Sequence, residues 1–187
     1  MTRKLVTALA ATSLAVLGAC SQEADDASDT AAGSTEPSND TLAVALGDAE
    51  GMETVSAALG DAGLAQVFDG AGSYTILAPS DAAFEKLGDT GKALLEPDQR
   101  AAMAAVLRDH IVVGYLEPSD IETAIEAKGG AVEARTMAGH VVTFSKEGDG
   151  IMVTSEDGSR AMLSGDAVRA SNGVALPVDG VLKKLDA

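Results

Sequence analysis

The side chains best suited to acid–base or metal chemistry are two histidines, His110 and His140. A zinc site needs several ligands at a characteristic spacing, and neither histidine stands in a pattern such as H-x-x-x-H. His110 follows Val106 and Leu107 closely enough to share the apolar face of an expected helix. We therefore predict that His110 is buried and hydrogen-bonded to the backbone, that His140 lies at the surface, and that the chain holds no metal.

Motifs for a nucleophile or for phosphate binding are also missing from the sequence. The chain contains no G-x-S-x-G, the turn that exposes the catalytic serine of α/β-hydrolases. Residues 88–93 differ from a phosphate-binding loop, because two residues instead of four separate the glycines and alanine replaces the magnesium-binding serine or threonine. We interpret this segment as an ordinary loop, and we predict no catalytic residues and no cofactor.

Acidic side chains gather around two turn sequences in the last third of the chain. An EF-hand calcium loop requires D-x-[DN]-x-[DN]-G with a glutamate at its twelfth position, and this pattern is absent. We expect a solvated acidic face, and weak calcium binding by it stays open. The residues concerned are Asp149, Glu156, Asp157 and Asp166.

The N-terminal residues 1–19 have the composition of a signal peptide. Arg3 and Lys4 precede an apolar run over residues 5–17, which is too short to span a bilayer. The run leads into Leu-Gly-Ala-Cys, which ends at Cys20, the only cysteine of the chain. This string resembles the lipobox of bacterial lipoproteins, and the resemblance implies that Cys20 is lipidated and becomes the first residue of the mature protein. The alternative is an ordinary signal peptide with Cys20 as a bystander.

Residues 20–40 are expected to form a disordered acidic tether behind the lipidated cysteine. Residues 21–40 contain six acidic side chains, no basic ones, and no leucine, isoleucine, valine or aromatic residue. Such a segment buries too little apolar surface to offset the entropy of ordering. The remaining residues, 41–187, are long enough for a single folded domain.

The charge of this domain disfavours several kinds of partner. Residues 41–187 carry 23 acidic and 11 basic side chains, a net charge of −12. Binding to nucleic acid or to anionic lipid head groups requires clustered lysine and arginine. The chain has five aromatic residues and no tryptophan, which also disfavours a stacking platform for sugars or bases.

Helical patterns dominate the first half of the domain. Met52, Val55 and Leu59 recur at helical spacing, and Ser80 is placed to cap a helix that follows it. Further along the chain, Ser119 and the glutamate three residues later match a capping box. The helices that these patterns predict cover residues 48–59, 81–87, 97–109 and the segment that begins at 119.

Short β-prone runs dominate the second half, after one earlier strand that Pro79 ends. Asp-Gly pairs within residues 147–150 and 156–159 are typical of hairpin turns. Pro177 interrupts the last apolar run and is expected at an edge or a bulge. Helices followed by strands predict an α+β domain, with helices covering one side or end of a small antiparallel β-sandwich. The expected strands cover residues 74–77, 132–136, 141–144, 151–154, 161–163, 168–171 and 174–182.

Three segments resemble signature motifs of the fasciclin domain family. Residues 74–84 resemble the first motif, residues 110–114 a turn after a helix, and residues 171–182 the second motif. The motifs occur in the family's order, so the resemblance extends over about residues 40–187 and implies a fasciclin-like fold. The matched residues are Ala78, Pro79, Asp81, Phe84, His110, Asn172, Gly173, Asp179 and Gly180.

The matched residues also have local explanations, so we predict that they determine the fold rather than bind a ligand. Asp81 is expected to meet the positive end of its own helix, and Asn172-Gly173 to form a turn with positive φ. Short adhesive motifs of animal members are altered here: Ala167 replaces the aspartate of an Asp-Ile motif, and Asp109 replaces the tyrosine of a Tyr-His pair. Integrin binding is therefore not implied.

The resemblance implies a non-enzymatic binding module, which we expect to act in cell adhesion or in association with a matrix or cell surface. The expected partners are a membrane, through the lipid, and an unidentified protein or polysaccharide; nucleic acid is not expected, and the protein is expected to be a monomer. Ser21 in place of an aspartate favours the outer membrane of a bacterial envelope, with the domain facing the periplasm or the outside. Two alternatives stay open: a periplasmic scaffold or stress-related protein, and a small-ligand binder.

Overall fold

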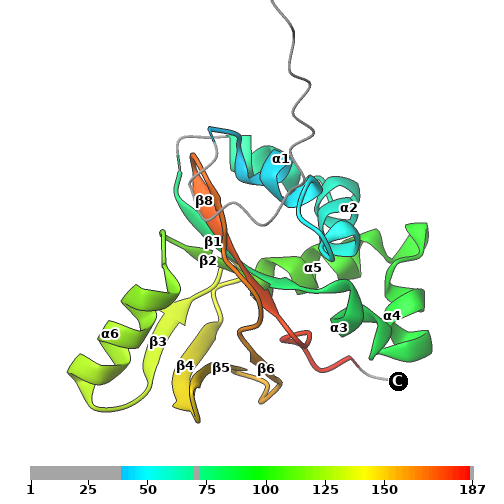
Figure 1. Ribbon diagram of the computed structural model, residues 1–187. Helices are drawn as coiled ribbons and strands as arrows, with labels where there is room; N and C mark the ends of the chain where they lie inside the picture. The colour runs from blue at the N-terminus through cyan, green and yellow to red at the C-terminus, as the bar shows by residue number, and fades with distance from the viewer. Residues whose placement is uncertain (1–38, 70–71, 186–187) are drawn as a thin grey trace, which may run out of the picture. The chain divides into compact units, whose positions relative to one another are not determined.

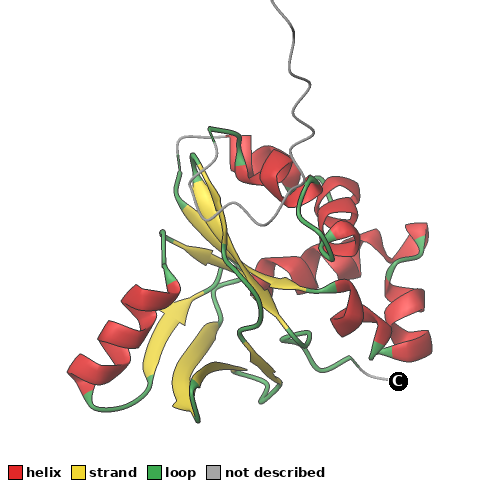
Figure 2. Cartoon of the chain, in the orientation of Figure 1, coloured by secondary structure: helices red, strands yellow, loops and turns green. Residues whose placement is uncertain are grey.

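The computed structural model describes residues 39–69 and 72–185. Helices occupy mainly the first half of this part of the chain and strands the second half (Figures 1 and 2). The helices are α1 (Leu42–Gly47), α2 (Glu53–Asp61), α3 (Asp81–Glu85), α4 (Gly88–Leu94), α5 (Arg100–His110) and α6 (Pro118–Lys128), with 3-10 turns η1 (Ala65–Asp69) and η2 (Pro97–Gln99). The strands are β1 (Tyr74–Pro79), β2 (Ile111–Val113), β3 (Val132–Arg135), β4 (Val141–Glu147), β5 (Gly150–Ser155), β6 (Arg160–Met162), β7 (Val168–Ala170) and β8 (Gly173–Val178).

The first sheet is buried on both of its faces. Its strand order is β2-β1-β8-β7, and β1 runs parallel to β8 but antiparallel to β2. Ile76 and Ala78 belong to a core shared with α1, α2 and α5, whereas Leu77 belongs to a second core shared with α6 and the other sheet. Burial on both faces explains why β1 and β8 have continuous apolar sequences instead of alternating ones.

The second sheet packs one face against the second core. Its order is β3-β4-β5-β6, and all of its pairings are antiparallel. Val142, Phe144 and Val153 are almost fully buried, while their sequence neighbours Thr143 and Ser145 are more exposed. Helix α6 lies against β3 and β4, apart from the other helices (Figure 1). The predicted α+β class is confirmed, but the expectation of purely antiparallel sheets is wrong for the first sheet, because its two central strands, β1 and β8, run parallel.

Two predictions about helices are wrong near glycines. The helix expected over residues 48–59 begins only at Glu53, as α2, and a helix that we did not predict, α1, precedes it; Gly51 between them has φ +75°, which is not a helical value. Residues 88–93 form most of α4, although we expected a loop there. A Cβ atom on Gly91 would lie 2.8 Å from the Phe84 carbonyl oxygen, so this glycine allows α4 to pack closely on α3.

The capping box of α6 also differs from the prediction. Glu117 and Asp120 form it, instead of Ser119 and the glutamate after it. Pro118 explains the shift, because its fixed φ suits the first helical position and the helix therefore starts at this residue.

Strand β8 ends earlier than expected, at Val178, opposite Pro79 of β1. Pro177 lies in this strand beyond the residues that pair with β7, so its missing N–H leaves no gap in that ladder. No helix among the described residues is long and apolar enough to cross a membrane.

Candidate functional site

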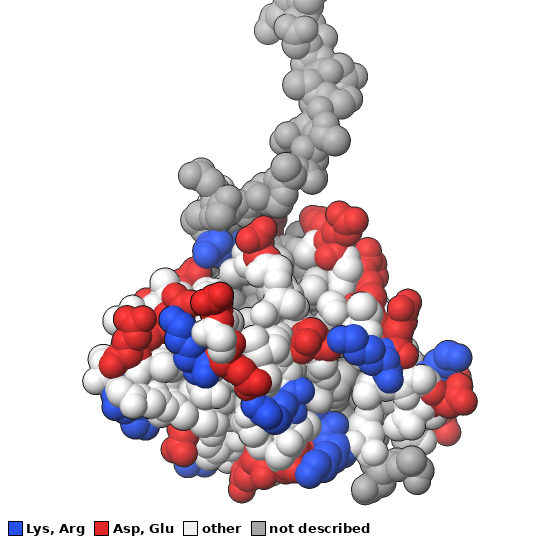
Figure 3. Space-filling view, turned by 60° about the horizontal axis from the view of Figure 1, so that its bottom comes forward, with Lys and Arg blue, Asp and Glu red and all other residues white. Residues whose placement is uncertain are grey.

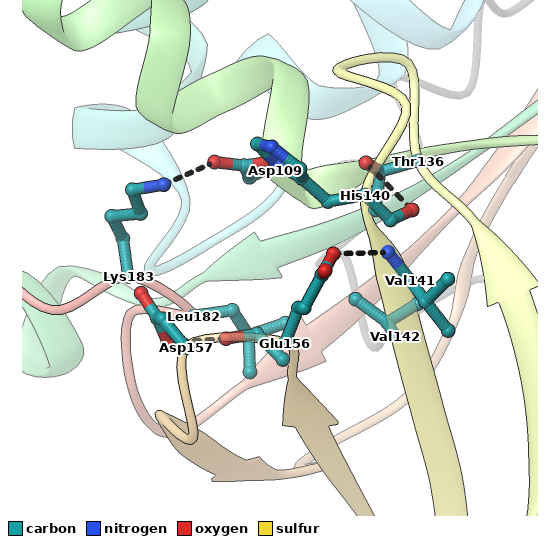
Figure 4. A pocket seen from close by; sticks show the side chains of 10 residues that line it. Asp109, Thr136, His140, Val141, Val142, Glu156, Asp157, Leu182 and Lys183 are labelled. Carbon is teal, nitrogen blue, oxygen red and sulfur yellow. Dashed lines mark hydrogen bonds and ion pairs between the residues drawn. The ribbon is translucent and has the colours of Figure 1, made fainter.

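A pocket of about 210 Å³, lined by several ionisable side chains, lies where the end of α5 meets the C-terminal segment and two turns (Figure 4). Asp109 comes from the last turn of α5, and His140 from the turn between β3 and β4. Lys183 belongs to the segment after β8, and Glu156 and Asp157 to the turn between β5 and β6. Four distant parts of the chain therefore place ionisable side chains around one small volume.

Asp109 is the buried centre of this pocket, with 8 % of its side chain exposed. One carboxylate oxygen accepts a hydrogen bond of 2.5 Å from His140 Nδ1, and the other accepts one of 3.0 Å from Lys183 Nζ. The hydrogen bond to Asp109 raises the pKa of Lys183 above its ordinary value. Both partners are partly exposed, so the buried charge is paired at the pocket wall.

The pocket resembles part of a catalytic triad but lacks the nucleophile. Asp109 and His140 form the carboxylate–imidazole pair that such sites use. The two hydroxyl groups in its lining are engaged elsewhere: Thr136 Oγ1 donates to the His140 carbonyl, and Ser155 Oγ donates to Asp157. Neither lining hydroxyl is hydrogen-bonded to the imidazole, so this geometry does not support acyl transfer.

Asp157 serves the turn in which it lies. Its carboxylate accepts hydrogen bonds from Ser155 Oγ, from the backbone and hydroxyl of Ser159, and from the Lys184 backbone N–H. Burial alone raises its pKa, but these bonds outweigh burial and hold the pKa well below its usual range. Within the described residues, no three histidine, aspartate or glutamate side chains are placed to share a metal ion.

His110 joins the end of α5 to the C-terminal segment. Its side chain is fully buried; Nδ1 donates to the Val106 carbonyl at 2.8 Å, and Nε2 accepts from the Leu182 backbone N–H at 2.9 Å. These two bonds require the neutral ring with its proton on Nδ1. Burial lowers the pKa of His110, in agreement with a neutral side chain. Both histidines lie where the sequence indicated: His110 is buried, and His140 is exposed at the surface, where it pairs with Asp109.

The motif residues at the C-terminal ends of the parallel strands β1 and β8 connect these strands to neighbouring elements. Asp81 begins α3, but its carboxylate accepts a 2.8 Å bond from the Thr54 backbone N–H at the start of α2. Asp81 also lies in the first turn of α3, at the positive end of that helix as we expected, while Ser80 caps α3. Asp179 similarly accepts from the Met162 backbone N–H at 2.7 Å. The remaining members at this end are Ala78 and Phe84, both buried, together with Pro79 and Gly180.

The motif residues at the other end of the sheet hold α1 in place. Asn172 Oδ1 accepts from the Leu42 backbone N–H at 2.8 Å, and its amide donates to the Phe68 carbonyl. Gly173 does not have the positive φ that we expected. A glycine is needed instead because a Cβ atom would lie 2.6 Å from the Tyr74 carbonyl oxygen and 2.8 Å from the Leu42 side chain. Cys20 lies outside the described residues.

A second charged cluster, which we did not predict, lies at the start of α6. Arg169 of β7 binds both carboxylate oxygens of Glu117, at 3.0 and 2.8 Å, and the Tyr115 hydroxyl donates to Glu117 at 2.7 Å. Burial and the neighbouring carboxylate raise the pKa of Tyr115 to about 12. Burial raises the pKa of Glu117 too, but the bonds from Arg169 and Tyr115 lower it below its usual range.

Sequence patterns could not reveal either cluster. Asp109 is 31 residues from His140 and 74 from Lys183, and Glu117 is 52 residues from Arg169. No local periodicity links such positions, and each pair forms only because the two sheets and the C-terminal segment are assembled. The clue within reach was Asp109 itself, where the sequence departs from the resembled Tyr-His pair.

Comparisons with known proteins agree with this architecture. The model of the fasciclin domain family matches residues 50–184. Protein sll1483 of Synechocystis sp. is 30 % identical over 149 residues, which cover 79 % of this chain and 75 % of that protein. The transforming growth factor-beta-induced protein ig-h3 of Sus scrofa is 29 % identical over 132 residues, which cover 70 % of this chain but 17 % of the relative.

A solved structure has the same fold. It is the FAS1 domain pair from the insect cell adhesion molecule fasciclin I, with a TM-score of 0.68 and 14 % sequence identity. The match covers 78 % of this chain and 51 % of that one. At this identity the comparison establishes the architecture alone.

Proposed function

This chain belongs to the fasciclin domain family, and from that premise we propose that it is a non-enzymatic binding domain that acts in cell adhesion or in attachment to a matrix or cell surface. In this proposal a lipid on Cys20 anchors the protein in a bacterial envelope, with the outer membrane favoured. Residues 20–40 separate the domain from the membrane, and a protein or polysaccharide is its ligand. The observation that carries the proposal is the family match, because fasciclin domains occur in cell adhesion molecules.

The chemistry of the described residues supports binding over catalysis. In the pocket around Asp109, the buried carboxylate pairs with Lys183 and is hydrogen-bonded to His140, and the lining hydroxyl groups are engaged away from the imidazole. On the face shown in Figure 3, basic side chains are interspersed with acidic ones instead of forming one basic patch. A nucleic acid ligand would require such a patch. A protein or polysaccharide is compatible with a mixed, mainly acidic surface.

Adhesion of intact cells tests the proposed role. Cells that produce the full chain are compared with cells that lack it, on layers of their own kind, on polysaccharide and on an abiotic surface, with and without calcium. We expect adhesion that depends on the chain and exceeds that given by an equally acidic lipoprotein. Equal adhesion with and without the chain would contradict the proposal and favour a periplasmic scaffold. Protease added to intact cells distinguishes the two, because it cleaves only an outward-facing domain.

Membrane fractionation of a Cys20→Ala variant tests the anchor. We expect wild-type protein in the membrane fraction and the variant in the soluble fraction, because the proposed acyl chains supply the attachment. Ser21→Ala is the matched control, since it changes a neighbouring residue and leaves the thiol in place. Unchanged processing and fractionation of Cys20→Ala would contradict lipidation.

A second candidate function follows from a pocket of about 420 Å³ between α2 and the corner that joins α4 to α5, whose lining combines apolar side chains with Asp61, Glu96 and Arg100. Ala58, Leu94 and Met103 form its buried wall, and its volume falls in the usual range for small-molecule sites. A thermal-shift screen against apolar compounds tests this alternative. Ala57→Leu narrows the pocket from an exposed position and should abolish any shift seen with the wild type. No shift with any compound would contradict it.

A further inference from the structure

Exposed apolar side chains concentrate at the end of β2 and in the turn that joins it to α6. Among the described residues, four large apolar side chains are exposed. Val44 and Leu95 stand singly in α1 and after α4, whereas Val113 and Tyr115 lie two residues apart. Val113 is the most exposed of the four at 66 %, and Tyr115 is 40 % exposed. We call residues 113–117 the Tyr115 loop.

The backbone of the Tyr115 loop is held firmly. The Thr75 side chain, which is fully buried in β1, donates to the Gly114 carbonyl at 2.8 Å and accepts from the Leu116 N–H at 2.9 Å. The Gly114 N–H donates to the Ser73 carbonyl at 3.0 Å. Surface loops are usually mobile, and this one instead has hydrogen bonds on both sides of Tyr115.

The Tyr115 ring is also fixed in orientation. Its hydroxyl donates to Glu117, and Arg169 holds Glu117 through two further hydrogen bonds. The hydroxyl is therefore already hydrogen-bonded, while 40 % of the residue stays exposed. A fixed aromatic side chain loses little entropy on binding, which is why tyrosine is common at interface hot spots.

The charges around the ring favour a cation. Arg169 neutralises Glu117, while Asp120 accepts a hydrogen bond from the Glu117 N–H and so lies at the same loop. Asp166 lies close enough to Arg169 to influence its pKa. The local excess of negative charge adds to the attraction between a guanidinium group and the face of a tyrosine ring.

We propose that the Tyr115 loop is the contact point for a basic protein segment, with an arginine stacked on the Tyr115 ring beside Asp120 and an aliphatic side chain of the partner against Val113. The inference deepens the proposed adhesive role and rests on it, because it assigns the ligand to the protein class. Hydroxyl-rich polysaccharide fits this surface less well, since the tyrosine hydroxyl is engaged and one ring is a small stacking platform.

Peptide binding to the purified full-length protein tests the site directly. The probes are fluorescein-labelled Leu-Arg-Leu and Leu-Glu-Leu peptides, followed by fluorescence anisotropy. We expect the arginine peptide to bind and the glutamate peptide to bind at least about tenfold more weakly. Tyr115→Ala should weaken binding of the arginine peptide at least about tenfold. Leu95→Ala, the matched control with similar exposure at a separate site, should leave it unchanged.

Each other outcome overturns the inference. Equal binding of both peptides would show that charge does not select the ligand, and no binding of the arginine peptide would remove the site. An equal loss in Leu95→Ala would indicate nonspecific apolar contact. Circular dichroism of each variant confirms folding, and Val113→Ser provides a second change at the loop that leaves the Tyr115–Glu117 bond in place.

Cell adhesion with the same variants separates this inference from the proposed function. If cells with the wild-type chain adhere and cells with Tyr115→Ala do so equally, the adhesive role stands and the Tyr115 loop is not its contact point. If wild-type cells do not adhere, the proposed function fails, and the peptide measurements still decide whether the loop binds basic segments.

Discussion

The two ends of the β1–β8 pair and the Tyr115 loop use polar contacts for different purposes. At the ends of the strands, Asp81, Asn172 and Asp179 accept backbone N–H groups from other elements and join those elements to the sheet. At the Tyr115 loop, the side chains of Thr75 and Glu117 also make hydrogen bonds, but these bonds fix a loop that carries exposed apolar side chains. The motif residues thus connect parts of the domain, whereas the Tyr115 loop is the surface that we propose for a partner.

The variant that should lower the stability of the domain most is Gly173→Val. The new Cβ would lie 2.6 Å from a backbone oxygen, so β1, β8 or α1 must move. We expect the free energy of unfolding to fall by about 3 kcal/mol, measured by urea denaturation. Gly60→Ala is the control, because its Cβ meets no atom within 4 Å and alanine favours the helix. A stable Gly173→Val protein that has lost adhesion would assign the motif to binding instead.

Asp81→Ala should have the next largest effect. It removes the acceptor for the Thr54 N–H at the start of α2, and we expect a loss of about 1.5 kcal/mol in unfolding free energy. Asp81→Asn keeps an acceptor oxygen and should recover much of this loss. Asp89→Ala, which alters an exposed residue of α4, should change stability little. Equal losses in all three variants would contradict the capping role.

Acidification tests the buried joint at His110. The native pKa is lowered by burial, so below the ordinary value of 6.5 the unfolded chain binds a proton that the native ring excludes. The contribution of neutral His110 to stability is fully present above pH 6.5. Between pH 7 and 5.5 we expect the free energy of unfolding to fall by about 1 kcal/mol. Asp157, whose native pKa is also lowered, loses its contribution only as the pH falls below 3.8. An NMR titration in which the His110 imidazole has an ordinary midpoint would contradict this explanation.

Tyr115→Ala should have the smallest effect on stability. The residue is 40 % exposed and its hydroxyl donates to Glu117, so we expect a loss of about 0.5 kcal/mol in unfolding free energy. Urea denaturation of Tyr115→Ala and Tyr115→Phe, compared with the wild type, shows how much of this loss is due to the hydroxyl group. A loss as large as that of Asp81→Ala would make the loop part of the structural framework and remove the contrast between the two regions.

Sequence reasoning reached the fold through residues with strong local preferences. Pro79, Ser80 and the Asp-Gly pairs act on residues next to them in the chain. The strand end, the cap of α3 and the hairpins were therefore predictable. Helix α4 was not predicted. We interpreted residues 88–93 as a loop after excluding a phosphate-binding motif; glycine weakens an isolated helix, yet close packing on α3 stabilises one there.

The sequence by itself determined the α+β class, the apolar faces, the acidic charge and the family, because each depends on residue type and local spacing. Only the tertiary structure decided that Asp81 caps α2, that Gly173 is required by close approach, and that Asp109 meets His140 and Lys183. It also decided that Arg169 fixes Tyr115 through Glu117. These contacts join residues tens of positions apart, and their distances are set by how sheets and helices pack, which no local pattern encodes.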